Sequence, residues 1–183
     1  MTIRAIIGTI AVLAGFAVLE RSVDASTGYA GSCQAGQAYA LLHPGEAIAV
    51  RAQPTPEGAV IGEFTTAHPD GPVASAVTLD SSRSGWARIV LASAAGFTPR
   101  NGGASMQFGW IPADQLEVGT KIDGAITTYT RPGLMGRQVS RIEGDDLKFR
   151  VLGCRGSWLQ VINERHGNIW IDRWCGREEG CRS

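Results

Sequence analysis

The chain has 183 residues, 24 of them glycine, and its 17 basic side chains balance its 17 acidic ones. A net charge of zero provides no bulk attraction to nucleic acid or to anionic lipid, so neither is expected as a partner. The length suits one ordinary domain or two small ones. Abundant glycine and turn signals about every ten residues favour an all-β fold.

The N-terminus has the pattern of an export signal. Residues 5–19 form an apolar run without charge, directly after Arg4. The run is shorter than the ~20 residues of a membrane-spanning helix. Because Val23 and Ala25 are small residues at the positions that a signal peptidase reads, residues 1–25 are predicted to be a secretory signal peptide. The alternative is an uncleaved membrane anchor. The protein is expected to be exported, periplasmic or extracellular, with no membrane contact beyond this segment.

The four cysteines are Cys33, Cys154, Cys175 and Cys181. An even number behind an export signal favours two disulfides. The sequence leaves the pairing open, and we favour a bond between Cys154 and either Cys175 or Cys181. A zinc site is the competing interpretation, but no Cys-x-x-Cys or His-x-x-x-His spacing supports it. No metal and no cofactor are therefore expected.

Two units follow the N-terminal segment. Residues 26–46 are small and polar, which predicts a linker or arm held by Cys33. In the first unit, residues 47–119, strands are predicted over 47–51, 59–64, 73–79, 86–91 and 108–112. A long hairpin tip is expected over 92–106, and one helical turn over 112–116. In the second unit, residues 120–183, strands are predicted over 126–130, 139–142, 149–152, 158–162 and 169–171, with a Cys-containing tail.

Short motifs recur in the same order in both units, which indicates a duplication. Val50-Arg51 matches Thr130-Arg131, and Val60-Ile61-Gly62 matches the run from Val139 to Ile142. Gly85-Trp86 matches Ser157-Trp158, and Gly109-Trp110-Ile111 matches Ile169-Trp170-Ile171.

These motifs resemble those of the bacterial Src-homology-3-like (SH3b) family. That family typically shows V-R-x-x-P, then G-W-x-x-V, then G-W-V and a one-turn helix. The resemblance implies two tandem small β-barrels, each with five strands. There are two departures from this pattern. Trp86 and Trp110 are 24 residues apart, whereas Trp158 and Trp170 are 12 apart, so the first unit carries an insertion. In the second unit, Ile169 occupies the position where the family has glycine.

The resemblance also implies a groove for an extended peptide, beside the start of the third strand. Candidate ligand-binding residues are Trp86, Tyr129, Trp158 and Trp174, with Arg131 and Arg155 for a carboxylate. Core packing is the competing role for each tryptophan, and it is the favoured role for Trp110 and Trp170.

An enzymatic function has little support. The histidines at 43, 68 and 166 lie beside Pro or Gly in expected turns, without a recognisable nucleophile setting. The acidic residues at 143, 145 and 146 are expected to form a solvated turn. The sequence therefore predicts an exported, non-catalytic binding module of the bacterial cell envelope, which recognises peptidoglycan peptide or the peptide segment of an envelope protein. The alternative is a periplasmic structural or accessory protein that acts by protein–protein interaction, in assembly or in enzyme inhibition.

Overall fold

The computed structural model describes residues 31–66, 73–119, 125–143 and 147–176. The expected signal peptide and Cys181 lie outside these ranges. The described residues form β-strands and three short 3-10 helices, which confirms the all-β prediction. Within these ranges, no helix combines the length and the apolar character needed to cross a membrane.

The strands follow the predicted order closely. The first part of the chain forms β1 (Gly31–Leu42), β2 (Ala47–Arg51), β3 (Val60–Thr65), β4 (Val73–Arg83), β5 (Trp86–Val90), β6 (Phe97–Pro99), β7 (Phe108–Pro112) and β8 (Leu116–Gly119). The 3-10 helices are η1 (Leu91–Ser93), η2 (Gly103–Ser105) and η3 (Ala113–Gln115). The second part forms β9 (Ala125–Tyr129), β10 (Gln138–Glu143), β11 (Lys148–Arg155), β12 (Trp158–Asn163) and β13 (Gly167–Ile171).

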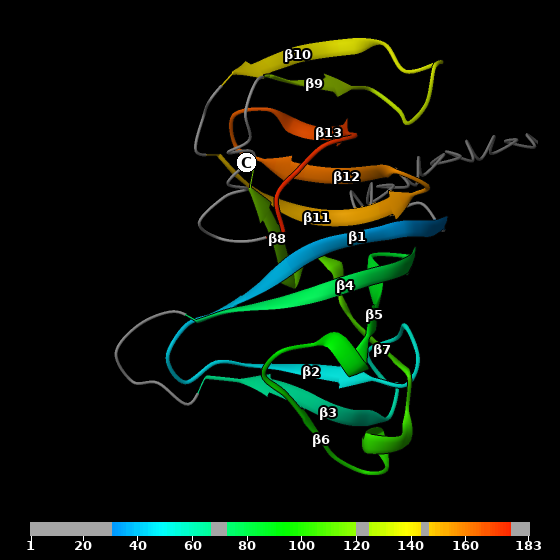
Figure 1. Ribbon diagram of the computed structural model, residues 1–183, viewed down its shortest axis with the longest axis vertical. Helices are drawn as coiled ribbons and strands as arrows, with labels where there is room; N and C mark the ends of the chain where they lie inside the picture. The colour runs from blue at the N-terminus through cyan, green and yellow to red at the C-terminus, as the bar shows by residue number, and fades with distance from the viewer. Residues whose placement is uncertain (1–30, 67–72, 120–124, 144–146, 177–183) are drawn as a thin grey trace, which may run out of the picture.

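All thirteen strands belong to one open antiparallel sheet, in the order β10-β9-β13-β12-β11-β8-β1-β4-β5-β7-β2-β3-β6. Two separate barrels were expected, but hydrogen-bonded pairing continues from one unit into the other. In Figure 1 the two units lie one above the other, with β1, β4 and β8 between them. Strands β10 and β6 lie at opposite ends of the sheet.

The pairing pattern within the sheet occurs twice. In the first unit β2 pairs with β3, β4 with β5, β5 with β7, and β7 with β2. In the second unit β9, β10, β11, β12 and β13 repeat these pairs. The register shifts recur as well. One bulge has its extra residue at Ile61 in β3 and at Val139 in β10. The other has its extra residue at Asp80 in β4 and at Leu152 in β11. β-bulges are retained structural features, so two matched bulges support an internal repeat.

The register corrects one detail of the expected repeat. Arg51 is the cross-strand partner of Trp110, and Tyr129 is the cross-strand partner of Trp170. The structural counterpart of Arg51 is therefore Tyr129, two residues before the Arg131 that the motif had suggested.

Strand β1 replaces most of the linker that was expected over residues 26–46. It pairs with β4 along most of its length and with β8 at Tyr39 and Ala40. β8 pairs in turn with β11, so β1 and β8 form the seam between the two units. The sequence suggested a loose arm because this segment is rich in Gly, Ala and Ser, which have low strand propensity.

The small residues of β1 allow close contacts at this seam. A Cβ on Gly31 would lie 2.7 Å from the carbonyl oxygen of Cys154, and a Cβ on Gly36 would lie 2.6 Å from the ring of Trp174. Neither distance is sterically tolerable, so both positions need glycine for a packing reason. Ala38 and Ala40 are fully buried.

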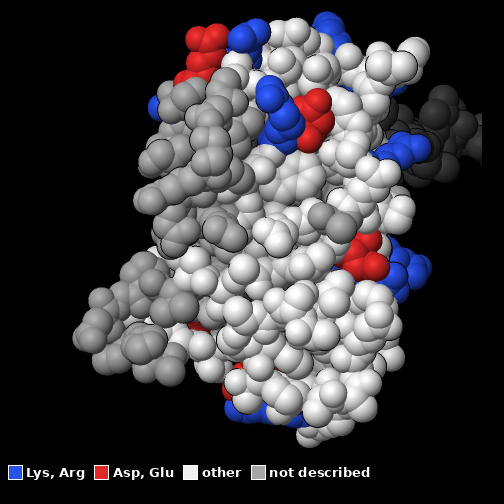
Figure 2. Space-filling model, viewed as in Figure 1, with Lys and Arg blue, Asp and Glu red and all other residues white. Residues whose placement is uncertain are grey.

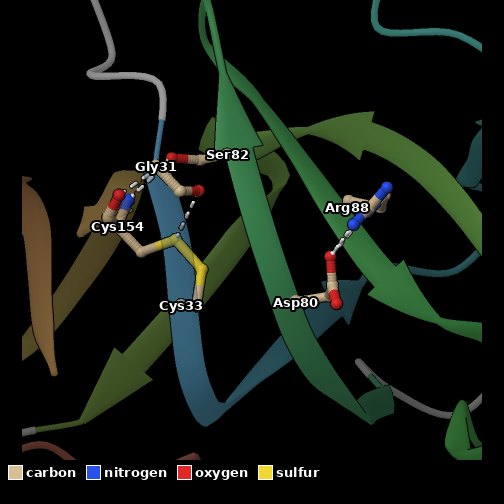
Figure 3. Close-up of a disulfide and its surroundings, with 6 residues drawn as sticks. All are labelled: Gly31, Cys33, Asp80, Ser82, Arg88 and Cys154. Atoms are coloured by element: carbon tan, nitrogen blue, oxygen red, sulfur yellow. Dashed lines mark hydrogen bonds and ion pairs between the residues drawn. A yellow bond between two sulfur atoms is a disulfide. The ribbon is translucent and has the colours of Figure 1, made fainter. Parts of the chain in front are cut away.

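A disulfide joins Cys33 of β1 to Cys154 of β11, residues 121 apart in the sequence (Figure 3). The pairing that we favoured from the sequence, Cys154 with Cys175 or Cys181, is therefore wrong. Cys175 is also disulfide-bonded. Beside the first bond, the buried hydroxyl of Ser82 in β4 accepts from the Cys154 N–H at 2.9 Å and donates to the Cys154 carbonyl at 3.2 Å. Covalent and hydrogen bonds thus connect β1, β4 and β11.

The insertion of the first unit has a defined structure. Residues 91–105 contain η1, β6 and η2, and β6 pairs with β3. The insertion therefore adds an edge strand to the sheet. One contiguous cluster of buried apolar side chains runs through both units and includes Ala38 of β1, Ile89 of the first unit and Leu159 of the second.

We expect the double substitution Cys33→Ser, Cys154→Ser to lower the free energy of unfolding by about 2–5 kcal/mol, because the bond restricts the unfolded chain across the seam. Urea denaturation of oxidised wild type and variant measures this difference, and the disulfide of Cys175 is present in both. Equal unfolding midpoints would show that the Cys33–Cys154 bond contributes nothing to stability.

Candidate functional site

The structure brings two of the predicted site residues together. The rings of Tyr129, at the end of β9, and Trp158, at the start of β12, meet edge to face with centroids 5.0 Å apart and an interplanar angle of 85°. Both side chains are half-buried, whereas Trp170 on the intervening strand β13 is buried. An edge-to-face pair with partial exposure offers rigid apolar surface at low entropic cost. Trp170 has the core role that we favoured for it.

Two predicted arginines lie close to this aromatic pair in the chain and in the sheet. Arg155 is the cross-strand partner of Trp158 at the β11–β12 turn, and its side chain is exposed. Arg131, also exposed, lies two residues after Tyr129. Neither side chain belongs to an ion pair among the described residues. Two exposed arginines, one opposite Trp158 and one two residues after Tyr129, suit a ligand that carries a carboxylate.

A feature that the sequence analysis missed is the exposed apolar pair at the tip of the loop between β9 and β10. Gly136 N–H donates to the Gly133 carbonyl at 3.0 Å, so Leu134 and Met135 occupy the central positions of a tight turn. Leu134 is fully exposed, and Met135 is 79% exposed. Turn centres usually hold Gly, Pro, Asn, Asp or Ser, so adjacent Leu and Met at the tip are unusual. Only their position in a turn, flanked by Gly133 and Gly136, could have indicated this from the sequence.

The loop is closed by hydrogen bonds at its base and packs against Tyr129. Thr130 and Arg137 close the loop through the Thr130 N–H to the Arg137 carbonyl at 2.9 Å, and the Arg137 N–H to Thr130 Oγ1 at 3.1 Å. A Cβ on Gly136 would lie 2.2 Å from the Arg131 carbonyl oxygen and 3.2 Å from the Tyr129 Cβ. The loop therefore packs directly on Tyr129, and it presents Leu134 and Met135 next to the predicted site.

The other two predicted tryptophans lie elsewhere. The Trp174 ring packs over Gly36, and its Nε1 donates to the Gln37 carbonyl at 2.7 Å, so Trp174 contacts β1 at the seam. Trp86 opens β5 in the first unit, where it matches Trp158. The residue that matches Tyr129 there is Arg51, whose guanidinium donates to the Gly58 carbonyl at 2.7 Å. The combination of tyrosine and tryptophan therefore belongs to the second unit.

In the first unit, the aromatic rings of Phe108 and Trp110 already contact a cation of the same chain, Arg88. Arg88 of β5 pairs with the bulge residue Asp80 at 2.5 Å (Figure 3). The same guanidinium lies 4.7 Å from the centre of the Phe108 ring and 5.8 Å from that of Trp110. These aromatic faces already hold a cation. On the face that Figure 2 shows, the charges of the described residues lie in small groups between large uncharged areas.

Two recesses adjoin the seam, and Glu117 of β8 and Arg150 of β11 line both. The smaller has a volume of about 170 Å³ and also contains His43, Glu46 and Asp114. The larger has a volume of about 510 Å³ and also contains Lys148, Ile162 and Glu164. One carboxylate oxygen of Glu117, Oε2, is buried and has no hydrogen-bond partner among the described residues.

Groups suited to catalysis are sparse in the described part of the chain. No three His, Cys, Asp or Glu side chains gather there in a way that could hold a metal ion. Ser140 Oγ and His166 Nδ1 are 3.5 Å apart, but the same hydroxyl lies 2.8 Å from Thr128 Oγ1. His166 Nε2 is buried without a hydrogen-bond partner among these residues, so no acidic side chain of the described ranges orients the imidazole as a nucleophile's base requires. His68, Asp145 and Asp146 lie outside the described residues.

A scan of the sequence against models of known protein families finds no match, and a search of curated proteins finds none either.

We expect Gly136→Ala to distort the turn that presents Leu134 and Met135, because the added methyl group would collide with backbone. Limited proteolysis within residues 131–137 should become at least several-fold faster. Gly133→Ala is the matched control: its Cβ meets nothing within 4 Å, although its φ of +82° adds strain of about 1 kcal/mol. Equal proteolysis of the Gly136 variant and wild type would contradict a turn held by close packing.

Proposed function

We propose that this protein is an exported, non-catalytic binding module of the bacterial cell envelope, which recognises peptidoglycan peptide or another extended peptide. The observation that carries the proposal is the rigid surface of the second unit: the Tyr129–Trp158 pair beside a tight turn that exposes Leu134 and Met135. Exposed apolar side chains gathered on a rigid element typically mark an interaction site. Arg131 and Arg155 add positive charge for a ligand carboxylate.

The repeated pairing order supports a relationship of each unit to the SH3-like barrels that the motifs resemble. Five strands of each unit pair in the same way, and in the first unit the one-turn helix η3 follows β7, where the family pattern has a one-turn helix. Under this proposal the two units are tandem SH3-like modules whose facing strands have merged into one sheet through β1 and β8.

Export is supported by chemistry at the seam and by the N-terminal sequence. Disulfides persist in oxidising compartments and are rare in the cytosol, so the Cys33–Cys154 bond favours a periplasmic or extracellular location. The apolar run of residues 5–19 followed by Ala25 is consistent with a signal peptide.

A second candidate function is an accessory role through protein–protein interaction, in assembly or in enzyme inhibition. The exposure of Leu134 and Met135 favours it to the same degree, because a folded partner with an apolar pocket would cover them as well as a peptide would. The two candidates differ in what the protein binds: the cell wall itself or another envelope protein.

We expect the protein to co-sediment saturably with purified peptidoglycan sacculi, and Trp158→Ala to weaken this binding by about tenfold, because tryptophan in a central contact commonly dominates binding energy. Trp86→Ala is the matched control, since it removes the same side chain from the equivalent position of the first unit. Thermal melting verifies that both variants fold. If wild type fails to bind, or if the two variants lose binding equally, the peptidoglycan site proposed in the second unit is wrong.

A further inference from the structure

The two ends of the sheet are equivalent strands with different surroundings. β3 of the first unit and β10 of the second occupy the same place in the repeat, at the outer side of β2 and β9. β6 pairs with the outer edge of β3, whereas β10 ends the sheet and no described strand pairs with its outer edge. The first unit thus contains an added strand at a position where no described strand pairs in the second.

The contacts of β6 show how a strand binds at this position. It runs antiparallel to β3, with Glu63 opposite Thr98 and Phe64 opposite Phe97. Just beyond β6, the Arg100 N–H donates to the carbonyl of the bulge residue Ile61 at 2.7 Å. The side chain of Arg100 also forms an ion pair with Glu63. Backbone pairing and one charge pair together hold the added strand.

The same backbone groups are available on β10. Ser140 directs its N–H to Thr128 Oγ1 at 3.0 Å, and its carbonyl accepts from that hydroxyl at 3.3 Å, so both groups of Ser140 face β9. Because successive residues of a strand direct their backbone groups to opposite sides, those of Arg141 face outward. Val139 is the extra residue of the β10 bulge, as Ile61 is of the β3 bulge. The outward backbone N–H and C=O groups of β10 therefore lie at the same register positions as those of β3 that face β6.

The side chains indicate what kind of strand would fit. Arg141 occupies the position of Glu63, so the charge that an added strand meets is reversed. Arg141 does pair with Glu143 at 3.0 Å, but both side chains are more than half exposed, and such surface pairs are weak. Val139 is 51% exposed and lies at the end of the loop that carries Leu134 and Met135. An added strand would therefore meet a cation and an apolar surface.

We infer that β10 binds an extended peptide as an additional antiparallel strand, with a carboxylate of the peptide facing Arg141. The inference rests on the proposed peptide-binding function and specifies its geometry: main-chain hydrogen bonds provide affinity, and Arg141 with the apolar loop provides selectivity. Ser140 restricts the ligand further. Ser140 occupies the position of Gly62 in the first unit. A Cβ on Gly62 would lie only 2.3 Å from the Phe97 ring, so a phenylalanine could not occupy the equivalent place beside Ser140. The peptide residue at that place must therefore be smaller.

The test uses two synthetic peptides with the sequence of residues 95–102 and Phe97→Val, one with Arg100→Glu and one that retains Arg100. Amide chemical-shift titration of the ¹⁵N-labelled protein reports both the affinity and the place of binding. We expect wild type to bind the Arg100→Glu peptide about fivefold more tightly than the peptide that retains Arg100, because one surface ion pair contributes up to about fivefold in affinity. The largest chemical-shift changes should fall in residues 138–143. Arg141→Glu should reverse the preference, and the control Arg83→Glu, an exposed cation on β4, should leave it unchanged.

Arg141→Pro tests the backbone contribution. Arg141→Ala removes the side chain alone, and Arg141→Pro removes in addition the outward N–H, which β9 does not use. Both variants should fold, and Arg141→Pro should bind the Arg100→Glu peptide about tenfold more weakly than Arg141→Ala does. Shifts confined to another surface, or a peptide preference that ignores the charge at position 141, would overturn the inference. If Arg141→Pro binds sacculi as wild type does, strand addition is wrong while the proposed function stands. If the peptide binds at β10 but wild type ignores sacculi, the envelope ligand is wrong while strand addition stands.

Discussion

The pairing of β1 with β4 and β8 is the constraint on which the rest of the structure depends. Each unit alone would be near the size at which a single hydrophobic core is marginal. The seam converts two small cores into one, because Ala38 and Ala40 are buried between the units and the apolar cluster continues through them. The Cys33–Cys154 bond and the two hydrogen bonds of Ser82 tie the same strands together. Small side chains in β1 are the condition for this close approach.

The repeated pairing pattern gives the molecule two similar sets of strands, which differ at the outer edge and at the exposed aromatic side chains. The first unit covers its outer edge with β6 and fills its exposed aromatic face with Arg88. In the second unit no described strand pairs with the outer edge of β10, and Tyr129 packs against Trp158. The first unit thus serves as an internal example of how the second could engage a ligand, and the candidate functions are concentrated in the second unit.

The sequence predicted most strands well, because alternating apolar residues between Gly and Pro turns are a local signal. It anticipated β2 over 47–51 and the one-turn helix η3, and it brought Tyr129 and Trp158 to the same proposed groove. It failed where the determining contact is long-range. The composition of β1 resembles a linker, and the partner of Cys33 lies 121 residues away. Likewise, neither the pairing of β6 with β3 nor the contact of Trp174 with β1 could be read from local pattern, since each depends on strands distant in the sequence.

The central claim is that the seam makes one cooperative unit of the two repeats. Native-state hydrogen exchange tests it most directly, with the buried amides of β5 in the first unit compared with those of β12 in the second, across a range of urea concentrations. The account predicts that Ile89 and Val161 exchange with the same free energy and the same denaturant dependence, both equal to those of global unfolding, because opening either repeat breaks the seam. Clearly different free energies for the two, with one repeat opening while the other stays protected, would contradict it.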